Sequence, residues 1–348
     1  MSAGSVQIIA TGPQDKFITG DPEVSFFGVN YKRHTNFALT RQQQLLQGKP
    51  IPGGRSKINF ERLGDLLGPV YITVVKDGET QLIDDWANVV HSCELYIGGS
   101  LIDTQDVQFT EEIAIDTMAT TLSKSYPASL HGGKGSDSFF YPMRFFFCEN
   151  WGSAIPVAGL QYHDVEIMIK WADNYDTSYK VEVNAYYITL DEAERQSITQ
   201  ERNMLIFQVQ KALPTHQRDI DLSFNHPVKF LASSNANPSA TNTLVSRQNI
   251  IRMIANGVDI IQPQLAVPHF TAVPSFYNTD YSYSNSENTF IHPFCLNTAK
   301  LQPTGALNFS RLDSFIITCE ESINTPIYAV NYNILKVKNG LGGLLFAN

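Results

Sequence analysis

Histidine, cysteine and acidic side chains are the usual material of catalytic and metal sites, and in this chain of 348 residues they form no recognisable motif. The eight histidines contain no H-x-x-x-H or H-x-H pair, and no G-x-S-x-G nucleophile elbow occurs. The sequence therefore predicts a protein that uses no metal or cofactor and is not an enzyme. One alternative stays open, because two carboxylates distant in sequence can meet in space, as they do in glycosidases.

The four cysteines follow one pattern. Cys93, Cys148, Cys295 and Cys319 each lie in or beside an apolar run, and no C-x-x-C pair occurs among them. A free cysteine in such a setting behaves as a small buried hydrophobe. We therefore expect four buried thiols and a reducing compartment.

Three local patterns resemble functional motifs but lack the necessary context. Residues 132–135 contain three glycines and a lysine, yet a Phe-rich segment follows them, where a phosphate-binding loop requires the start of a helix. Glu111, Glu112 and Asp116 are predicted to form the solvent face of a helix over residues 107–122, not a catalytic set. The one sequon, at Asn308, falls in a predicted turn, and a reducing location would leave it unmodified.

The charge balance argues against one class of partner. The chain has 34 acidic and 25 basic residues, a formal net charge of −9 and a pI near 5.4. Neutralising phosphates requires clustered Lys and Arg, so we expect no direct contact with nucleic acid. The first residues lack a basic stretch followed by an apolar core, and no run reaches about 18 apolar residues. We therefore expect a soluble protein without a signal peptide or membrane span.

Residues 139–171 should form the centre of the fold. Residues 139–148 are an almost unbroken apolar and aromatic run, which predicts a strand buried on both faces. In the last part of the stretch, Val165, Ile167 and Ile169 alternate with Glu166, Met168 and Lys170, which predicts a strand with one buried face and one wet or contact face. Two strands joined at a Phe-rich bend are typical of an all-β sandwich.

The remaining pattern predicts two β-rich halves. Strands are expected over residues 25–39, 57–63, 70–76, 94–97, 101–104, 179–190, 203–209, 228–232, 249–255, 311–319 and 327–338. Asp191, followed three residues later by Glu194, predicts the start of a short helix between the halves. We therefore expect an extended arm over residues 1–22, a first jelly roll over 23–190, a linker helix over 191–202 and a second jelly roll over 203–348. The fold class is all-β, with two consecutive antiparallel jelly-roll sandwiches and short accessory helices.

Six longer segments resemble, in order, the landmarks of the double jelly-roll major capsid proteins of nucleocytoplasmic large DNA viruses, the lineage of giant viruses, phycodnaviruses and iridoviruses. They are TGDPEVSFFGVNYKRHTNF (19–37), GGSLIDTQD (98–106), FFYPMRFFFCENWGSAIPVAGLQYHDVEIMI (139–169), YYITLDEAER (186–195), QPTGALNFSRLD (302–313) and YAVNYNILKVKNGLGGLLFAN (328–348).

This resemblance implies a structural protein of an icosahedral shell. Three chains would form a pseudo-hexagonal capsomer in the virion capsid, assembled in the host cytoplasm. The implied partners are further copies of the chain, neighbouring capsomers, and minor capsid and penton proteins, with an inner viral membrane as a further partner of the arm. A minor or paralogous capsid or scaffolding protein and a glycan-binding jelly-roll module stay open as alternatives, because fold alone does not determine function.

A shell protein needs large complementary faces, which commonly use aromatic and arginine anchors. Residues 275–290 are rich in Tyr, Ser and Asn, a mixture that suits adaptable contact surfaces, and residues 32–34 form the most basic local patch. The predicted subunit-interface residues are therefore Arg33, His34, Arg144, Trp151, Tyr281 and Tyr283.

Overall fold

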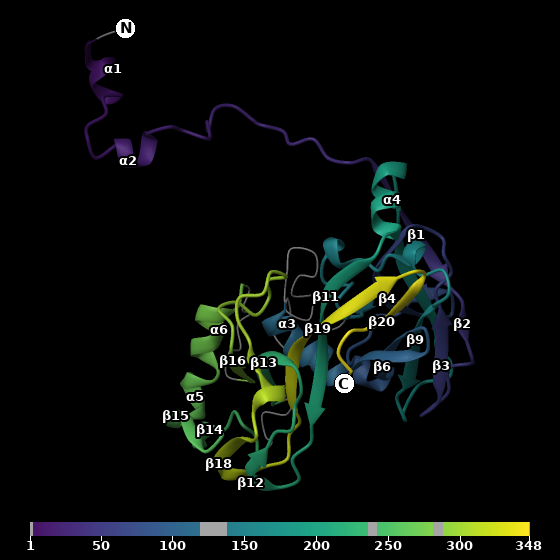
Figure 1. Ribbon diagram of the computed structural model, residues 1–348. Coiled ribbons are helices and arrows are strands. Elements are labelled where there is room, and N and C mark those ends of the chain that lie inside the picture. Colours follow the sequence, from purple (N-terminus) through teal and green to yellow (C-terminus); the bar gives the residue numbers. More distant parts are fainter. Residues whose placement is uncertain (1–2, 119–137, 236–241, 281–287, 348) are drawn as a thin grey trace. The chain divides into compact units, whose positions relative to one another are not determined.

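The computed structural model describes residues 3–118, 138–235, 242–280 and 288–347, and it divides the chain into two units, Met1–Asn36 and Phe37–Asn348 (Figure 1). The N-terminal unit contains two short helices, α1 (Ala3–Ile8) and α2 (Lys16–Thr19), and residues 20–36 have no regular structure.

The strand expected over residues 25–39 is therefore wrong for most of its length. Phe27, Val29 and Tyr31 alternate as strand residues do, but all three are exposed and no partner strand pairs with them in the described chain. An alternating pattern becomes a strand only where another backbone supplies hydrogen bonds. In this region pairing begins at Phe37.

Two antiparallel sheets form the first jelly roll. Sheet I contains β1 (Phe37–Gln44), β10 (Lys180–Leu190), β4 (Leu66–Lys76) and β5 (Glu79–Thr80) in that order, with β8 (Tyr141–Pro142) also paired to β4. Sheet II contains β2 (Leu46–Gln47), β3 (Arg55–Asn59), β9 (Val165–Trp171), β6 (Val90–Ile97) and β7 (Ser100–Asp106). The buried aromatic and aliphatic side chains of these sheets form one core, which also includes Met204, Ile206, Leu335 and Val337 from the second half of the chain.

Two further antiparallel sheets form the second jelly roll. Sheet III contains β11 (Arg202–Ala212), β19 (Ile327–Lys338), β13 (Pro227–Ser234) and β16 (Thr289–Pro293), with β17 (Leu307–Asn308) paired to β13 and β20 (Leu341–Leu344) paired to β19. Sheet IV contains β12 (Gln217–Asp221), β18 (Phe315–Ile323), β14 (Ile250–Ala255) and β15 (Val258–Leu265). Helices α5 (Ala266–His269) and α6 (Ala272–Asn278) follow β15.

The clearest sequence signals produce the expected elements. In β9 the residues from Val165 to Trp171 alternate between buried and half-buried, as the period of two predicts. Gly98 and Gly99 both have positive φ and close the hairpin between β6 and β7, where a side chain would be strained. Helix α4 (Glu192–Thr199) begins after Asp191, whose carboxylate accepts a hydrogen bond from the Glu194 N–H.

The prediction of a strand over residues 139–148 is also wrong for most of its length. Only Tyr141–Pro142 pairs as a strand, and Phe145, Phe146 and Phe147 lie in a turn. All three rings are nevertheless buried, and Phe146 meets Phe147 edge to face with centroids 5.5 Å apart. The apolar run marks a core position correctly, but burial on all sides does not require an extended backbone.

The segment between β7 and β8 joins the two jelly rolls. Its described part folds into a π-helical turn, η2 (Phe109–Ile113), followed by α3 (Ala114–Thr117), so the helix predicted over residues 107–122 is present but irregular up to Thr117, and residues 119–122 lie outside the described residues. Short 3-10 turns lie elsewhere in the chain: η1 (Trp86–Asn88), η4 (Trp151–Ser153), η5 (Val157–Gly159) and η6 (Phe309–Arg311). Figure 1 shows α3 next to β19 and β13.

Candidate subunit interface

One part of the junction between the two jelly rolls is built from the segment that follows β7. Phe109, Ile113 and Met118 pack against Phe230 and Tyr328 on the outer face of sheet III. Aromatic contact reinforces the packing, because the rings of Phe109 and Tyr328 have centroids 5.6 Å apart. The two rolls are thus held together by a continuous apolar cluster.

Carboxylates of the same segment add polar contacts. Asp106 accepts a hydrogen bond from the Tyr328 hydroxyl and forms an ion pair with Lys211 at 2.5 Å. Asp116 accepts from the Thr289 hydroxyl at 2.8 Å. Burial raises the pKa of Asp116 to about 6, against the hydrogen bond from Thr289, which favours the charged form.

These contacts change the role predicted for the acidic residues of the helix. The carboxylate of Glu112 accepts a hydrogen bond from the Ser234 hydroxyl, and both Glu112 and Asp116 are half-buried. The expectation of a plain solvent face is therefore wrong for these two residues. They connect the first roll to the second, because the second roll supplies the donors.

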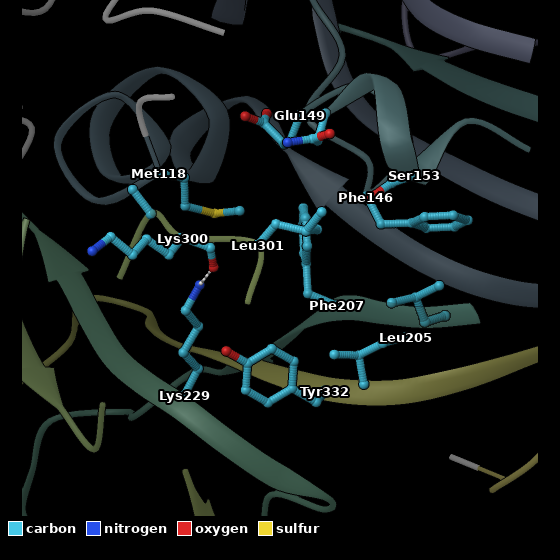
Figure 2. Close-up of a pocket in the computed structure, with 13 residues that line it drawn as sticks. Met118, Phe146, Glu149, Ser153, Leu205, Phe207, Lys229, Lys300, Leu301 and Tyr332 are labelled. Atoms are coloured by element: carbon cyan, nitrogen blue, oxygen red, sulfur yellow. Dashed lines mark hydrogen bonds between the residues drawn. The ribbon is translucent and has the colours of Figure 1, made fainter. Parts of the chain in front are cut away.

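A small cavity lies inside the same junction. Figure 2 shows Met118, Phe146 and Glu149 of the first roll facing Lys229 and Tyr332 of the second. The space is about 40 Å³, enough for a few water-sized groups. The Lys229 ammonium donates to the Lys300 carbonyl at 3.3 Å and lies 5.7 Å from the centre of the Tyr332 ring. The burial of Lys229 lowers its pKa to about 8.

Arg144 requires a correction as an interface residue. It is 2% exposed and pairs with Glu149 at 3.5 Å, so its guanidinium lies inside this chain and is not offered to a neighbour. Its backbone carbonyl accepts from Gln105 of β7. The sequence pattern predicts a surface anchor at this arginine, but the buried Glu149 five residues later is the partner that allows Arg144 to be buried.

The other predicted interface residues lie in different surroundings. Arg33 and His34 are exposed in the N-terminal unit, where His34 Nδ1 is 2.7 Å from the Thr35 carbonyl. Trp151 is 41% exposed on the first roll. Tyr281 and Tyr283 lie outside the described residues. A common interface formed by Arg33, His34, Trp151, Tyr281 and Tyr283 therefore stays a prediction.

Sequence reasoning missed an aromatic row beside Trp151, on the outer face of sheet I. The Trp151 ring meets the Tyr186 ring edge to face, with ring centroids 6.0 Å apart. The centroid of the Tyr186 ring is 6.3 Å from that of Tyr71, and the Tyr71 and Phe140 centroids are 5.6 Å apart. Arg41 of β1 donates to the Tyr71 hydroxyl at 3.3 Å. The signal was present in the Tyr186-Tyr187 pair of β10: Tyr187 is buried, which leaves Tyr186 on the outer face.

A second exposed aromatic surface lies on α6. Phe276 is 78% exposed and Tyr277 is 74% exposed, and their rings meet edge to face at 4.9 Å. Both belong to the Tyr-, Ser- and Asn-rich stretch that the sequence singled out as a contact surface. Exposed aromatic pairs of this kind are typical anchors of protein interfaces.

The residues that the structure describes contain no group of three or more His, Cys, Asp or Glu side chains arranged to hold a metal ion. Within the same residues, no helix combines the length and apolar character that crossing a bilayer requires. All four cysteines are buried and free, as predicted.

Two consecutive jelly rolls joined by a packed junction define a double jelly-roll protein, and solved structures show the same fold. PBCV-1 VP54 superposes with a TM-score of 0.77 at 24% identity, covering 93% of this chain and 100% of that chain. The Faustovirus major capsid protein superposes with a TM-score of 0.63 at 10% identity, covering 94% of each chain.

Sequence comparison gives the family. The family described as "Major capsid protein N-terminus" matches residues 25–203. The major capsid protein of Pyramimonas orientalis virus is 29% identical over 401 residues, and that of Paramecium bursaria Chlorella virus 1 is 26% identical over 445 residues, with all of both chains covered in each case. The chain belongs to the major capsid protein family, and it is a structural protein of the virion capsid of large DNA viruses.

Proposed function

We propose that three copies of this chain form a pseudo-hexagonal capsomer, and that these capsomers tile the icosahedral shell of a large double-stranded DNA virus. The observation that carries the proposal is the complete pair of jelly rolls: three chains supply six similar sandwiches, enough to surround a central axis. Its role is structural and not catalytic. Assembly takes place in the host cytoplasm, and the shell protein makes no direct contact with nucleic acid.

Mass and shape in solution test this proposal. Three chains of 38.9 kDa give a particle of about 117 kDa, which light scattering on a sizing column measures directly. Negative-stain images of the same peak should show a hexagonal outline. A monomer at every concentration, with no hexagonal particles, would contradict the proposal.

The N-terminal arm has a separate role in this account. Its side chains Ile8, Phe17 and Ile18 are all more than four-fifths exposed, so a single chain leaves these apolar side chains in water. We propose that residues 1–22 contact minor capsid or penton proteins or an inner viral membrane. Arg33 and His34, which follow the arm, stay predicted contacts to a neighbouring subunit.

Deletion of residues 1–22 tests the arm. The shortened chain should form the trimer as the full chain does, because the four sheets begin at Phe37. Shell assembly with the other virion proteins should be impaired. Shells that form at the normal yield from the shortened chain would contradict this role.

A further inference from the structure

The two jelly rolls repeat one another strand by strand. In sheet I the order β1-β10-β4 is extended by β8, and in sheet III the order β11-β19-β13 is extended by β16. In sheet II the order β3-β9-β6-β7 corresponds to β12-β18-β14-β15 in sheet IV. It follows that β15 is the counterpart of β7, and that α5 and α6 are the counterparts of η2 and α3.

The register extends the repeat to side chains on the outer faces. Lys211 of β11 lies opposite Tyr328 of β19, and the lysine ammonium is 5.3 Å from the centre of that ring. Arg41 of β1 lies opposite Tyr186 of β10. A cation on the first strand of the sheet faces a tyrosine on its neighbour in both rolls.

Inside one chain, the junction buries the helical segment of the first roll against the sheet face of the second. Here η2 and α3 cover sheet III, and β7 lies against β11. Gln208 of β11 donates to the Ile102 carbonyl, and the Val209 N–H donates to the carboxylate of Asp103 at 2.8 Å. The first roll therefore supplies the helical segment, and the second supplies the sheet face.

The other half of the repeat stays exposed in the part of the chain that the structure describes. Its helical segment carries the exposed Phe276 and Tyr277, and its sheet face carries the row from Trp151 through Tyr186 to Tyr71. Seven of the eight residues of β1 and seven of the eight of β15 are exposed. These are the counterparts of the surfaces that the internal junction buries.

The two unused surfaces cannot meet within one chain. Figure 1 shows α5, α6 and β15 on the left of the second roll, away from the first roll, whereas β1 belongs to the first roll and lies near α4 on the right. Only another copy can present sheet I to α6. A contact between different surfaces of identical chains closes into a ring when its rotation divides a full turn.

We propose that α5, α6 and β15 of one copy dock on the outer face of sheet I and on β1 of the next copy, repeating the internal junction between chains. This inference rests on the proposed trimer and names the two surfaces that close it. Phe276 and Tyr277 are the anchors on one side, and Tyr71, Tyr186 and Trp151 receive them on the other. Three internal and three external junctions then alternate around the capsomer.

A charge placed on the α6 surface tests the contact. Phe276→Glu should convert the particle of about 117 kDa to a monomer of 38.9 kDa, because a carboxylate would be buried among aromatic rings. Tyr162→Glu is the matched control: Tyr162 is 74% exposed but belongs to neither surface, so this variant should remain trimeric. Circular dichroism and thermal melting should show that both variants are folded.

A cross-link tests the pairing directly, even if the glutamate variant folds poorly. The double variant Tyr186→Cys with Tyr277→Cys should give covalent dimers and trimers on oxidation, since the four native cysteines are buried. A mixture of the two single variants should give dimers only. The inference would be overturned if wild type and Phe276→Glu were both trimeric and the double variant gave no cross-link. The proposed trimer would still hold in that case. A monomeric wild type would overturn the proposed function itself.

Discussion

The Tyr328 hydroxyl of the second jelly roll donates to the Asp106 carboxylate of the first, with the two carboxylate oxygens 2.9 and 2.8 Å away. These residues are 222 positions apart in sequence. Burial and the negative charge of Asp106 raise the pKa of Tyr328, so the hydroxyl keeps its proton and remains a donor. The relationship makes the internal junction directly testable.

Tyr328→Phe should lower the free energy of unfolding by about 2 kcal/mol, because a hydrogen bond to a charged partner is lost while the ring still packs. Thermal or urea unfolding measures the change. Tyr162→Phe, on an exposed ring, should change stability by less than about 0.5 kcal/mol. Equal effects of the two substitutions would show that the Asp106 contact does not hold the rolls together.

Asp103 should make the chain more stable at mildly acidic pH. Burial raises its pKa from 3.8 to about 7, so the folded state binds the proton more tightly than the unfolded state does. Its contribution to the free energy of unfolding therefore rises as pH falls from above 7 towards 4. Asp116, with its pKa raised to about 6, acts in the same direction.

Asp103→Asn removes this titration and isolates it. The stability of Asp103→Asn relative to wild type, from urea unfolding, should increase between pH 5 and pH 8, since only wild type loses the proton there. Asp164→Asn, on an exposed carboxylate, should show a constant difference from wild type. A constant difference for Asp103→Asn as well would contradict the buried carboxylate.

Lys229 should make the chain more stable as the pH rises into the alkaline range. Its pKa is lowered to about 8 by burial, so in the folded state it loses its proton before the unfolded chain does. Wild type should gain stability relative to Lys229→Met as pH rises from 8 to 10, by on the order of 2 kcal/mol. Urea unfolding across this range measures it. A parallel pH dependence in the two proteins would mean that the amine is solvated.

The hairpin between β6 and β7 offers a matched pair of glycines. Gly98 and Gly99 both have positive φ, so alanine should cost about 1 kcal/mol of backbone strain at each. At Gly98 the added methyl would also overlap the His163 imidazole, which lies 2.8 Å from the Gly342 carbonyl, whereas space is open at Gly99. Gly98→Ala should therefore lower the free energy of unfolding by about 2 kcal/mol more than Gly99→Ala does. Its melting temperature should be correspondingly lower. Equal melting temperatures would contradict the packing of His163 on this turn.

Local patterns predicted the parts of the fold that local physics controls. The alternation around Ile167, the glycines at 98 and 99, and the capping carboxylate of Asp191 each predicted the element that forms. Each signal depends on residues within a few positions, so it can be read from the chain directly. The resemblance of the six longer segments to the major capsid proteins predicted the family.

The rest depends on contacts between distant segments. Phe27 and Val29 alternate like strand residues, but none of the strands that the structure describes pairs with them. Arg144 is buried because Glu149 and the Phe-rich turn surround it, which a local pattern does not encode. The aromatic row from Trp151 through Tyr186 to Tyr71 forms only when η4, β10 and β4 fold side by side.

The most direct test of the whole account is an electron cryomicroscopy reconstruction of the purified wild-type protein. The account predicts three copies around a threefold axis, six jelly rolls in a pseudo-hexagonal ring, and α6 of each copy seated on sheet I of the next. A reconstruction with a threefold axis but with Tyr186 and Phe276 both facing solvent would contradict the proposed contact. A monomer, or an oligomer without a threefold axis, would contradict the capsomer itself.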